Sequence, residues 1–349
     1  KQKTRNKLLL VFLHDQGMIT DESVEALMET DNPPMLDQWF SYLPQLEEGL
    51  KNHDEKIEIL QHRTITETDL AKYGGILMER AQHESGVFVE GYLLESWLEG
   101  EEYKLIITPR YVNNIQEQQQ LFAWIRQLAE DIIKPDMTDY EKVKTIHDFL
   151  IIALQYDTRA EPPKSSYHAF GALNTGKAMC QAYAELMVLL LNKVGVPCRM
   201  VTGIGNDLDH AWNIVSIDGE LYHVDTTWDD PESNIFRYEY FNITDEEMKR
   251  EHVWTEQDYP ACTAVKDNYF VRENLIIPDD TALRKALRDT LNRKKTLCMF
   301  KLDGFTVTND SVGDMMEKIN EQAGYVISSY RFSYNEALNI ILLESIEYN

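Results

Sequence analysis

Cysteine is scarce in this chain, with only four in 349 residues. The four lack the paired spacings of a disulfide framework, and the absence of CxxC and HxxxH patterns argues against a zinc site. No apolar run approaches the ~18 residues that a membrane-spanning helix needs, and Leu8–Leu13 is followed directly by polar residues. Low-complexity tracts are lacking as well. We therefore expect a folded protein without a metal, a cofactor or an integral membrane segment.

Basic residues are also few, because 34 Lys and Arg stand against 59 Asp and Glu, giving a net charge of −25 and a pI near 4.7. This excess of negative charge repels phosphate backbones and anionic membrane surfaces, so we expect no nucleic-acid partner. An acidic, solvated surface explains it best, although basic or polyamine-like substrates also fit. The length and the hydrophobic fraction of 43% allow two or three domains with full cores.

The first residues bear on the location of the protein. The chain begins without Met, in a basic stretch that contains Lys1, Lys3, Arg5 and Lys7. Such a start fits the removal of a leader or anchor segment, and it fits a shortened chain equally well. We expect an extracellular or cell-surface protein, with the cytoplasm as the alternative, and the sequence assigns no oligomeric state.

Cys180 lies in a setting typical of a reactive cysteine. It precedes a run from Gln181 to Val194 whose apolar residues recur at helical spacing, and it follows a loop-forming stretch that ends at Gly176. A cysteine at a helix N-terminus faces unpaired N–H groups and the positive end of the helix dipole, which favour the thiolate. We interpret Cys180 as a nucleophile. The remaining cysteines fit buried structural roles: Cys198, Cys262 and Cys298.

Two strand-like runs farther along the chain predict a hairpin. Residues 210–217 (HAWNIVSI) and 220–227 (ELYHVDTT) are separated by Asp218-Gly219, a strong signal for a two-residue turn. This turn pairs Ile217 with Glu220 and thereby fixes the register of the whole hairpin. A slip of one residue would move every side chain to the other face.

The predicted register brings a histidine and a carboxylate to one face of the hairpin. It pairs Trp212 with Asp225, so His210 becomes a diagonal neighbour of Asp225, about 7–8 Å away at the backbone. The same count puts His223 on this face opposite Ile214, which makes His223 a competitor for the role of base. We favour His210, since choosing His223 leaves His210 without a role.

The Cys180 helix, HAWN at 210–213 and DTTWDDP at 225–231, in this order, resemble the core of the transglutaminase-like superfamily. This papain-like fold is shared by transglutaminases, certain bacterial cysteine proteases and peptide N-glycanases, and the resemblance extends from about residue 140 to 254. It implies an α+β fold in which the cysteine helix packs on an antiparallel sheet. One departure is Ala182, where many bacterial relatives have glycine, and its methyl group narrows the space near the nucleophile.

The resemblance also implies a reaction, in which Cys180 attacks an amide carbonyl, His210 acts as base and acid, and Asp225 orients His210. The backbone N–H of Cys180 is the first donor expected for the oxyanion. A side-chain donor or an acyl pocket is expected among five residues: Tyr167, His168, Asn174, Tyr183 and Trp212. Water as the second reactant gives hydrolysis and an amine gives cross-linking, and the sequence does not decide between them.

We therefore expect a bacterial-type cysteine protease or transglutaminase-like acyltransferase that acts through a thioester on amide bonds of a protein or peptide. Two alternatives stay open. One is an adaptor that uses the fold only for binding. The other is an amidase that cuts peptidoglycan peptides, for which a Cys-His-His pattern would employ His223.

Smaller modules are expected on both sides of a catalytic core at residues 116–275. Residues 1–50 are predicted to be helical, with an interruption at Asp31–Pro34. The flanking segments 51–115 and 276–349 both show the order strand, helix, strand, strand. We interpret each of them as a small α+β module.

Overall fold

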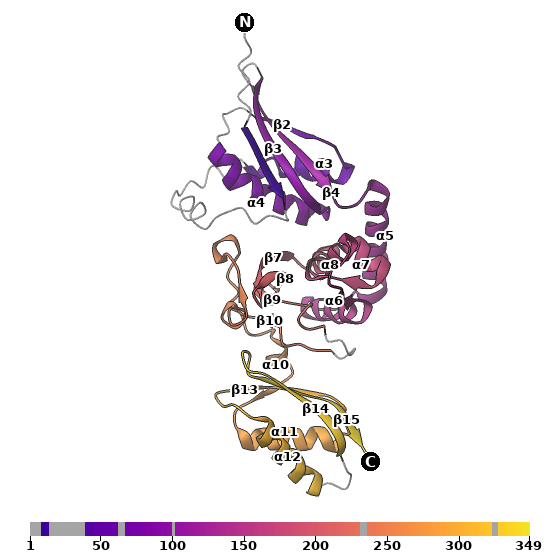
Figure 1. The fold of residues 1–349 in the computed structure, drawn as a ribbon, viewed down its shortest axis with the longest axis vertical. Coiled ribbons are helices and arrows are strands. Elements are labelled where there is room, and N and C mark those ends of the chain that lie inside the picture. Colours follow the sequence, from indigo (N-terminus) through magenta and orange to yellow (C-terminus); the bar gives the residue numbers. More distant parts are fainter. Residues whose placement is uncertain (1–7, 14–38, 62–66, 100–101, 231–235, 323–326) are drawn as a thin grey trace.

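The computed structural model describes residues 8–13, 39–61, 67–99, 102–230, 236–322 and 327–349. Figure 1 shows an elongated molecule in which an N-terminal part, a central part and a C-terminal part follow one another along the long axis. Each part has its own cluster of buried apolar residues. The predicted α+β class is confirmed.

The N-terminal part is a four-stranded sheet with the order β1-β3-β4-β2. Its strands are β1 (Leu8–Leu13), β2 (Ile57–Gln61), β3 (Val89–Glu99) and β4 (Glu102–Tyr111). Alternate residues of β2 and β4 are buried together with apolar residues of helices α3 (Leu43–Asn52) and α4 (Glu67–Ser85). The period of two arises because successive side chains of a strand point to opposite faces, and only one face meets the helices.

The helical prediction for residues 1–50 is wrong for Leu8–Leu13, which pairs antiparallel with β3 as strand β1. Six apolar residues are too few for a typical helix, whereas an edge strand needs no more than this. The prediction is right for the start of α3, which begins at Leu43. Residues 1–7 and 14–38 of the predicted segment lie outside the described residues.

The C-terminal part has the sheet order β12-β13-β15-β14. Its strands are β12 (Ile276–Ile277), β13 (Cys298–Leu302), β14 (Ile327–Asn335) and β15 (Ile340–Tyr348), and its helices are α11 (Asp280–Asn292) and α12 (Asn309–Gln322). Both flanking parts contain three strands in the chain order strand, helix, strand, strand. In the sheet, the third of these strands lies between the other two, as β2-β4-β3 and β13-β15-β14. The two parts therefore share this topology and differ in where the fourth strand joins.

Strands β13 and β15 of the C-terminal sheet are buried on both faces. Phe300 and Leu343 belong to the cluster that includes α11 and α12, whereas Met299, Ile340 and Leu342 belong to the cluster of the central part. The module is thus packed against the central part through an apolar sheet face, below it in Figure 1.

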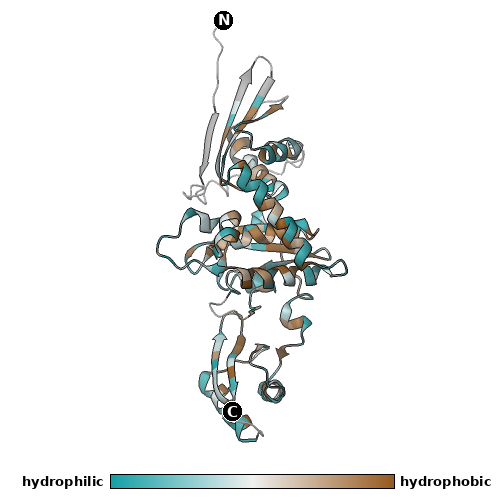
Figure 2. Cartoon of the chain, turned by 90° about the vertical axis from the view of Figure 1, so that its right-hand side faces the viewer, coloured by the Kyte–Doolittle hydropathy of each residue, from teal (hydrophilic) through white to brown (hydrophobic). Residues whose placement is uncertain are grey.

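The central part contains the sheet β10-β9-β8-β7-β11, next to helices α5 (Ile115–Ile132), α6 (Asp139–Ala153), α7 (Ala169–Thr175) and α8 (Cys180–Lys193). The strands are β7 (Cys198–Gly205), β8 (Leu208–Ile217), β9 (Glu220–Val224), β10 (Phe241–Ile243) and β11 (His252–Val253). All residues from Ala182 to Leu191 in α8 are buried, and the interior of this layer is coloured as hydrophobic in Figure 2. Such close packing around α8 fixes the position at which the helix starts.

The β8–β9 hairpin has the predicted register, with Ile217 opposite Glu220 and Ile214 opposite His223. Both turn residues, Asp218 and Gly219, have positive φ angles of 52° and 86°, as a type I′ turn requires. The side chains that the sequence predicts on one face therefore do share it.

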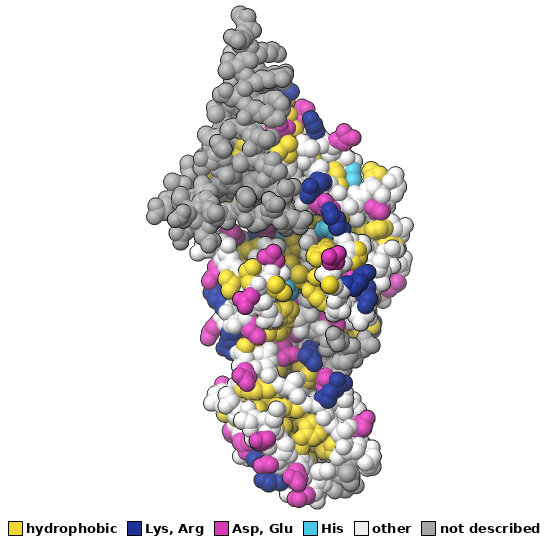
Figure 3. Space-filling model, in the orientation of Figure 1, with side chains coloured by type: hydrophobic (Ala, Val, Ile, Leu, Met, Phe, Trp, Pro, Cys, Tyr) yellow, Lys and Arg dark blue, Asp and Glu magenta, His cyan; other side chains and the backbone are white. Residues whose placement is uncertain are grey.

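Negative charge is spread over the face of the molecule that Figure 3 draws. Figure 3 shows Asp and Glu side chains scattered over the central and C-terminal parts, with Lys and Arg between them. Among the described residues, no helix is long and apolar enough to cross a membrane.

Candidate active site

Cys180 is the first residue of α8 and is half-buried, at the helix start that the sequence predicts. Backbone hydrogen bonds hold the segment just before it, residues 177–179. Strand β6 (Lys177–Ala178) pairs in parallel with β5 (Gln155–Tyr156), and the N–H of Met179 donates to the carbonyl of Ser166 at 2.7 Å. The thiol thus has a defined position relative to the sheet.

The N-terminus of α8 has free hydrogen-bond donors. Helices α5, α6 and α11 begin with side-chain caps from Asn114, Thr138 and Asp279, whereas Met179 provides no side-chain cap to α8. Within the described part of the chain, the N–H groups of Cys180 and the next residue have no acceptor. Uncapped N–H groups at a helix start are available to a negatively charged group.

His210 and Asp225 are in contact, as the hairpin register predicts. The Nε2 atom of His210 lies 2.7 Å from Oδ2 of Asp225, and both residues are buried. Strand β9 ends at Val224, and the N–H of Asp225 donates to the carbonyl of Tyr240 at 3.0 Å. Asp225 thus occupies the first position after the strand, where its side chain reaches that of His210.

The carboxylate of Asp225 accepts four hydrogen bonds. Its Oδ1 accepts from the backbone N–H groups of Thr227 and Trp228 at 3.0 and 3.1 Å, and its Oδ2 accepts from His210 and from Nε2 of His252 at 3.1 Å. Burial alone would raise the pKa of Asp225, but the charge and the hydrogen bond of His210, together with His252, lower it below the ordinary value. The group is therefore a stable anion in a fully buried position.

The protonation of His210 follows from its neighbours. Burial disfavours the imidazolium, but the charge and hydrogen bond of Asp225 and a hydrogen bond with the Cys180 thiol outweigh it and raise the pKa of His210 to about 10. Because Nε2 points to Asp225, Nδ1 is left to face the thiol. His210 is thus positively charged at neutral pH, and a neighbouring cation favours a thiolate.

His223 is held in a separate set of contacts. Its Nδ1 accepts from Nε1 of Trp212 at 3.0 Å, and its Nε2 lies 2.8 Å from the carboxylate of Asp245. Burial lowers the pKa of His223 despite the influence of Asp245, so the ring is neutral and carries its proton on Nε2. Both nitrogens are engaged away from Asp225.

The five predicted pocket residues differ in their environments. Three have their polar atoms engaged: Nδ1 of His168 lies 2.9 Å from Glu185, the hydroxyl of Tyr183 donates to Asp230, and Nε1 of Trp212 donates to His223. Asn174 is exposed near the end of α7, and Tyr167 is half-buried. Of these residues, Tyr167 and Tyr183 interact electrostatically with a polar group beside Cys180, the phenol of Tyr156.

Sequence reasoning missed two residues at this site, Tyr156 and His252. Tyr156 lies opposite Ala178 in the β5–β6 pair, and its phenol interacts electrostatically with Cys180. The Gln155-Tyr-Asp157 segment forms part of the family resemblance, which is the signal that could have found Tyr156. His252 lies 27 residues after Asp225 and no local pattern links the two.

Metal binding has two geometric candidates within the described residues. The first group is His210, Asp225 and His252, and the second is His223, Asp245 and Cys262. Within each group, the possible ligand atoms lie within 4.8 Å of one another. A ligating nitrogen must be unprotonated. In both groups, however, the histidine nitrogens that face the carboxylate lie at hydrogen-bonding distances of 2.7 to 3.1 Å from it. These contacts fit a proton network better than a metal site.

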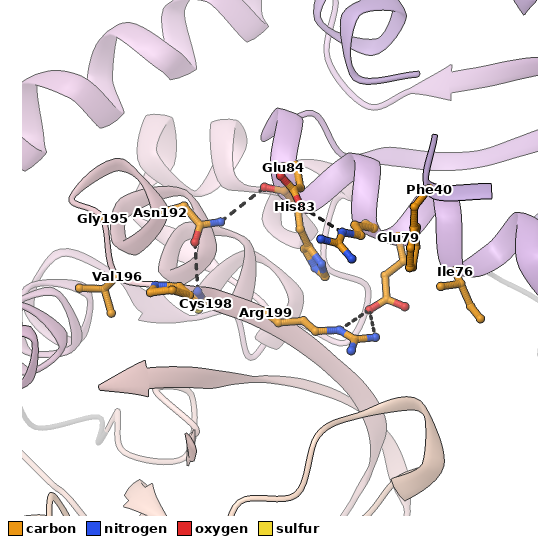
Figure 4. A pocket seen from close by; sticks show the side chains of 12 residues that line it. Phe40, Ile76, Glu79, His83, Glu84, Asn192, Gly195, Val196, Cys198 and Arg199 are labelled. Carbon is orange, nitrogen blue, oxygen red and sulfur yellow. Dashed lines mark hydrogen bonds and ion pairs between the residues drawn. The ribbon is translucent and has the colours of Figure 1, made fainter. Parts of the chain in front are cut away.

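A cavity of about 570 Å³ lies elsewhere, between α4 and the turn that leads from α8 into β7. Figure 4 shows Glu79 of α4 paired with Arg199 of β7. The side chain of Asn192 donates to the carbonyl of His83 in α4 and accepts from the N–H of Cys198 in β7. The carboxylate of Glu79 is 2.8 Å from the guanidinium of Arg199. None of Cys180, His210 and Asp225 lines this cavity, and its paired charges join the N-terminal part to the central part.

Comparison with known proteins gives a partial match. Residues 126–226, a stretch that contains Cys180, His210 and Asp225, match the family model described as Transglutaminase-like superfamily. Kyphoscoliosis peptidase is 29% identical over 116 residues in Homo sapiens and 28% identical over 118 residues in Mus musculus. These matches cover 29% and 30% of this chain but only 18% of each relative.

A solved structure of a TGase shares 15% sequence identity, covering 52% of this chain and 54% of that one, with a TM-score of 0.28. This score is too low to support an argument. The family match and the curated relatives therefore show a likeness to transglutaminase-like domains for about 30% of this chain, including residues 126–226.

Proposed function

Because residues 126–226 form a transglutaminase-like domain, we propose that this chain is a cysteine-nucleophile acyl-transfer enzyme that acts on peptide or isopeptide amides through a thioester. The observation that supports this best is the line of contacts from Cys180 through His210 to Asp225. A half-buried thiol beside an imidazolium that is itself paired with a buried carboxylate is the arrangement that activates a cysteine nucleophile.

In the proposed reaction, the Cys180 thiolate attacks the amide carbonyl carbon and the carbonyl oxygen becomes an oxyanion. His210 donates its proton to the leaving nitrogen as the C–N bond breaks, which leaves an acyl thioester and a neutral imidazole. His210 then takes a proton from the second reactant, water or an amine, which attacks the thioester and releases the thiolate. Asp225 holds the ring so that Nδ1 faces the reacting atoms.

Two donors are proposed for the oxyanion. The first is the backbone N–H of Cys180, which has no acceptor among the described residues. The second is the phenol of Tyr156, for which the described residues offer no hydrogen-bond partner. Burial, followed by the charge of Cys180, raises the pKa of Tyr156 to about 12, so the phenol keeps its proton and can donate it in a hydrogen bond.

The test is the pH dependence of iodoacetamide labelling at Cys180, followed by mass spectrometry. The other three cysteines are buried, which leaves Cys180 as the accessible thiol. We expect rapid labelling of the wild type at pH 6, well below the ~8.5 at which a free thiol ionises, and its loss in His210→Ala. His223→Gln serves as the matched control and should label within two- to threefold of the wild type, since its ring contacts Trp212 and Asp245 instead.

If the wild type and His210→Ala both label slowly at pH 6, with the pH dependence of a free thiol, the proposed function is refuted and a binding module is favoured. Rapid labelling that depends on His223 instead would favour a Cys-His-His amidase. Incubation with peptide amides, with and without an added primary amine, then separates hydrolysis from transfer, because only transfer adds the mass of the amine to the product.

A further inference from the structure

Asp225 has a second imidazole partner besides His210. The Nε2 atom of His252 lies 3.1 Å from Oδ2, the same oxygen that His210 contacts at 2.7 Å. The His252 side chain is fully buried, and its ring lies against Trp228 and Trp212 with centroid distances of 4.1 and 5.0 Å. Its Nδ1 is buried without a partner among the described residues. Within the described part of the chain, the ring therefore forms its hydrogen bond with Asp225 alone.

We propose that His252 is a positioning residue that fixes the carboxylate of Asp225 toward His210, and that the C-terminal module holds His252 in place. This inference rests on the proposed function, because His252 acts on Cys180 only through Asp225 and His210.

The geometry explains why a second imidazole matters. Two backbone N–H groups hold Oδ1 and two ring N–H groups hold Oδ2, so the carboxylate cannot rotate without losing donors. A buried carboxylate remains ionised only while such donors compensate for the lost water. Removal of His252 takes away one of the four, which raises the pKa of Asp225 and frees Oδ2 to turn away from His210.

The segment that carries His252 is anchored from outside the central part. Strand β11 has only two residues, which pair with β7 at Gly205 and Ile204. Just before it, Glu247 forms an ion pair with Lys301, and the guanidinium of Arg250 donates to the carbonyl of Ala337 at 2.6 Å. Lys301 and Ala337 belong to the C-terminal module, so the module supplies contacts that the short strand lacks.

A third contact connects the C-terminal module to the segment that carries His252 through Tyr240. The side-chain amide of Asn335, at the end of β14, lies 3.3 Å from the hydroxyl of Tyr240, and this hydroxyl also contacts Glu251, the residue before His252. The Tyr240 carbonyl accepts from the N–H of Asp225 at 3.0 Å. The hairpin of the C-terminal module is thus connected to both members of the Asp225–His252 pair.

The test uses variants that differ in the reach of one polar group. His252→Gln places an amide N–H near the position of Nε2, whereas His252→Asn is too short and His252→Leu has no donor. We expect labelling of Cys180 at pH 6 to fall about tenfold in the Asn and Leu variants, the value of one hydrogen bond to a charged group, and to recover in the Gln variant. Circular dichroism and thermal unfolding identify variants that fail to fold, and the Asn and Gln pair remains decisive if the Leu variant does so.

The pH profile must be interpreted with every titratable group near the pair. Asp225 or His252 interacts with groups on β8, β9, β5 and the turn after β9: His210, His223, Tyr156 and Asp229. Cys180 of α8 interacts with two of these groups, His210 and Tyr156. His223→Gln is the matched control, as a buried histidine of the same sheet whose carboxylate partner is Asp245. It should label within two- to threefold of the wild type at each pH.

The role of the module is tested with the double variant Arg250→Ala, Lys301→Met, which removes two of its contacts with the segment before His252. We expect a fall of two- to threefold in labelling at pH 6. Arg288→Ala is the control, because Arg288 bonds to Gln322 within the module.

The outcomes separate this inference from the proposed function. If wild-type labelling depends on His210 but the Asn, Gln and Leu variants of His252 all label like the wild type, the positioning role is wrong and the proposed function stands. If wild-type labelling does not depend on His210, the proposed function is refuted, and the role of His252 is refuted with it. A folded double variant that labels at the wild-type rate overturns the part assigned to the module.

Discussion

The substitution Asp225→Asn tests the electrostatics of the site most directly. The pKa of His210 is raised from 6.5 to about 10, and the charge and hydrogen bond of Asp225 are the largest of the effects that raise it. Each pKa unit corresponds to 1.36 kcal/mol, so the net rise in the pKa of His210 corresponds to about 5 kcal/mol. With asparagine at this position, burial is no longer outweighed, and the pKa of His210 should fall below 6.5.

The consequences for reactivity and for stability have defined signs. A neutral His210 at pH 7 no longer pairs with a thiolate, so labelling of Cys180 at pH 6 should fall at least a hundredfold. Because the pKa of His210 in the folded protein is above its unfolded value, its stabilising contribution is complete below pH 6.5 and is lost as the pH rises toward 10. The decrease in unfolding temperature over this window should therefore be smaller in Asp225→Asn than in the wild type.

Histidine NMR titration provides the assay, since it reports the protonation of His210 separately from labelling. Asp225→Glu is the control that keeps the charge. A His210 that titrates at the same pH in the wild type and in Asp225→Asn would refute the reasoning, whatever the labelling rate.

Three further predictions concern single contacts. Tyr156→Phe should lower acyl transfer from a peptide amide by about 10²–10³ in kcat, the usual cost of one oxyanion donor, while labelling of Cys180 is unchanged because no oxyanion forms in alkylation. Leu186→Ala, at a fully buried position of α8, should lower the free energy of unfolding by about 2–5 kcal/mol in a urea titration. A Cβ at Gly203 would lie 2.3 Å from the carbonyl oxygen of Val253, so Gly203→Ala should displace β11 and slow the labelling of Cys180 as His252→Leu does.

The parts of the site that could be predicted depend on local rules. The register of the β8–β9 hairpin follows from a two-residue turn at Asp218-Gly219, and this register alone brings His210 close to Asp225. The start of α8 follows from apolar spacing and from the loop that ends at Gly176. Each of these signals lies within one short, continuous stretch of the chain.

The parts that could not be predicted depend on contacts between distant segments. His252 reaches Asp225 because the chain passes through β10 and α9 (Asp245–Met248) before β11 pairs with β7. Tyr156 approaches Cys180 through a two-residue parallel pairing that has no periodicity to detect. Such contacts are decided by packing of the whole domain, which one-dimensional patterns do not encode.

The two flanking modules share a topology but differ in how many faces of their strands are buried. Along β2, buried Ile57 and Ile59 alternate with exposed Glu58 and Leu60, so only one face of that strand is covered. By contrast, β15 has an unbroken run of buried residues from Ile340 to Glu344, the pattern of a strand with both faces covered. The second face of the C-terminal sheet packs on the central part, so that module supports the central part directly. A position close to the segment that carries His252 is therefore a consequence of the apolar pattern of β15.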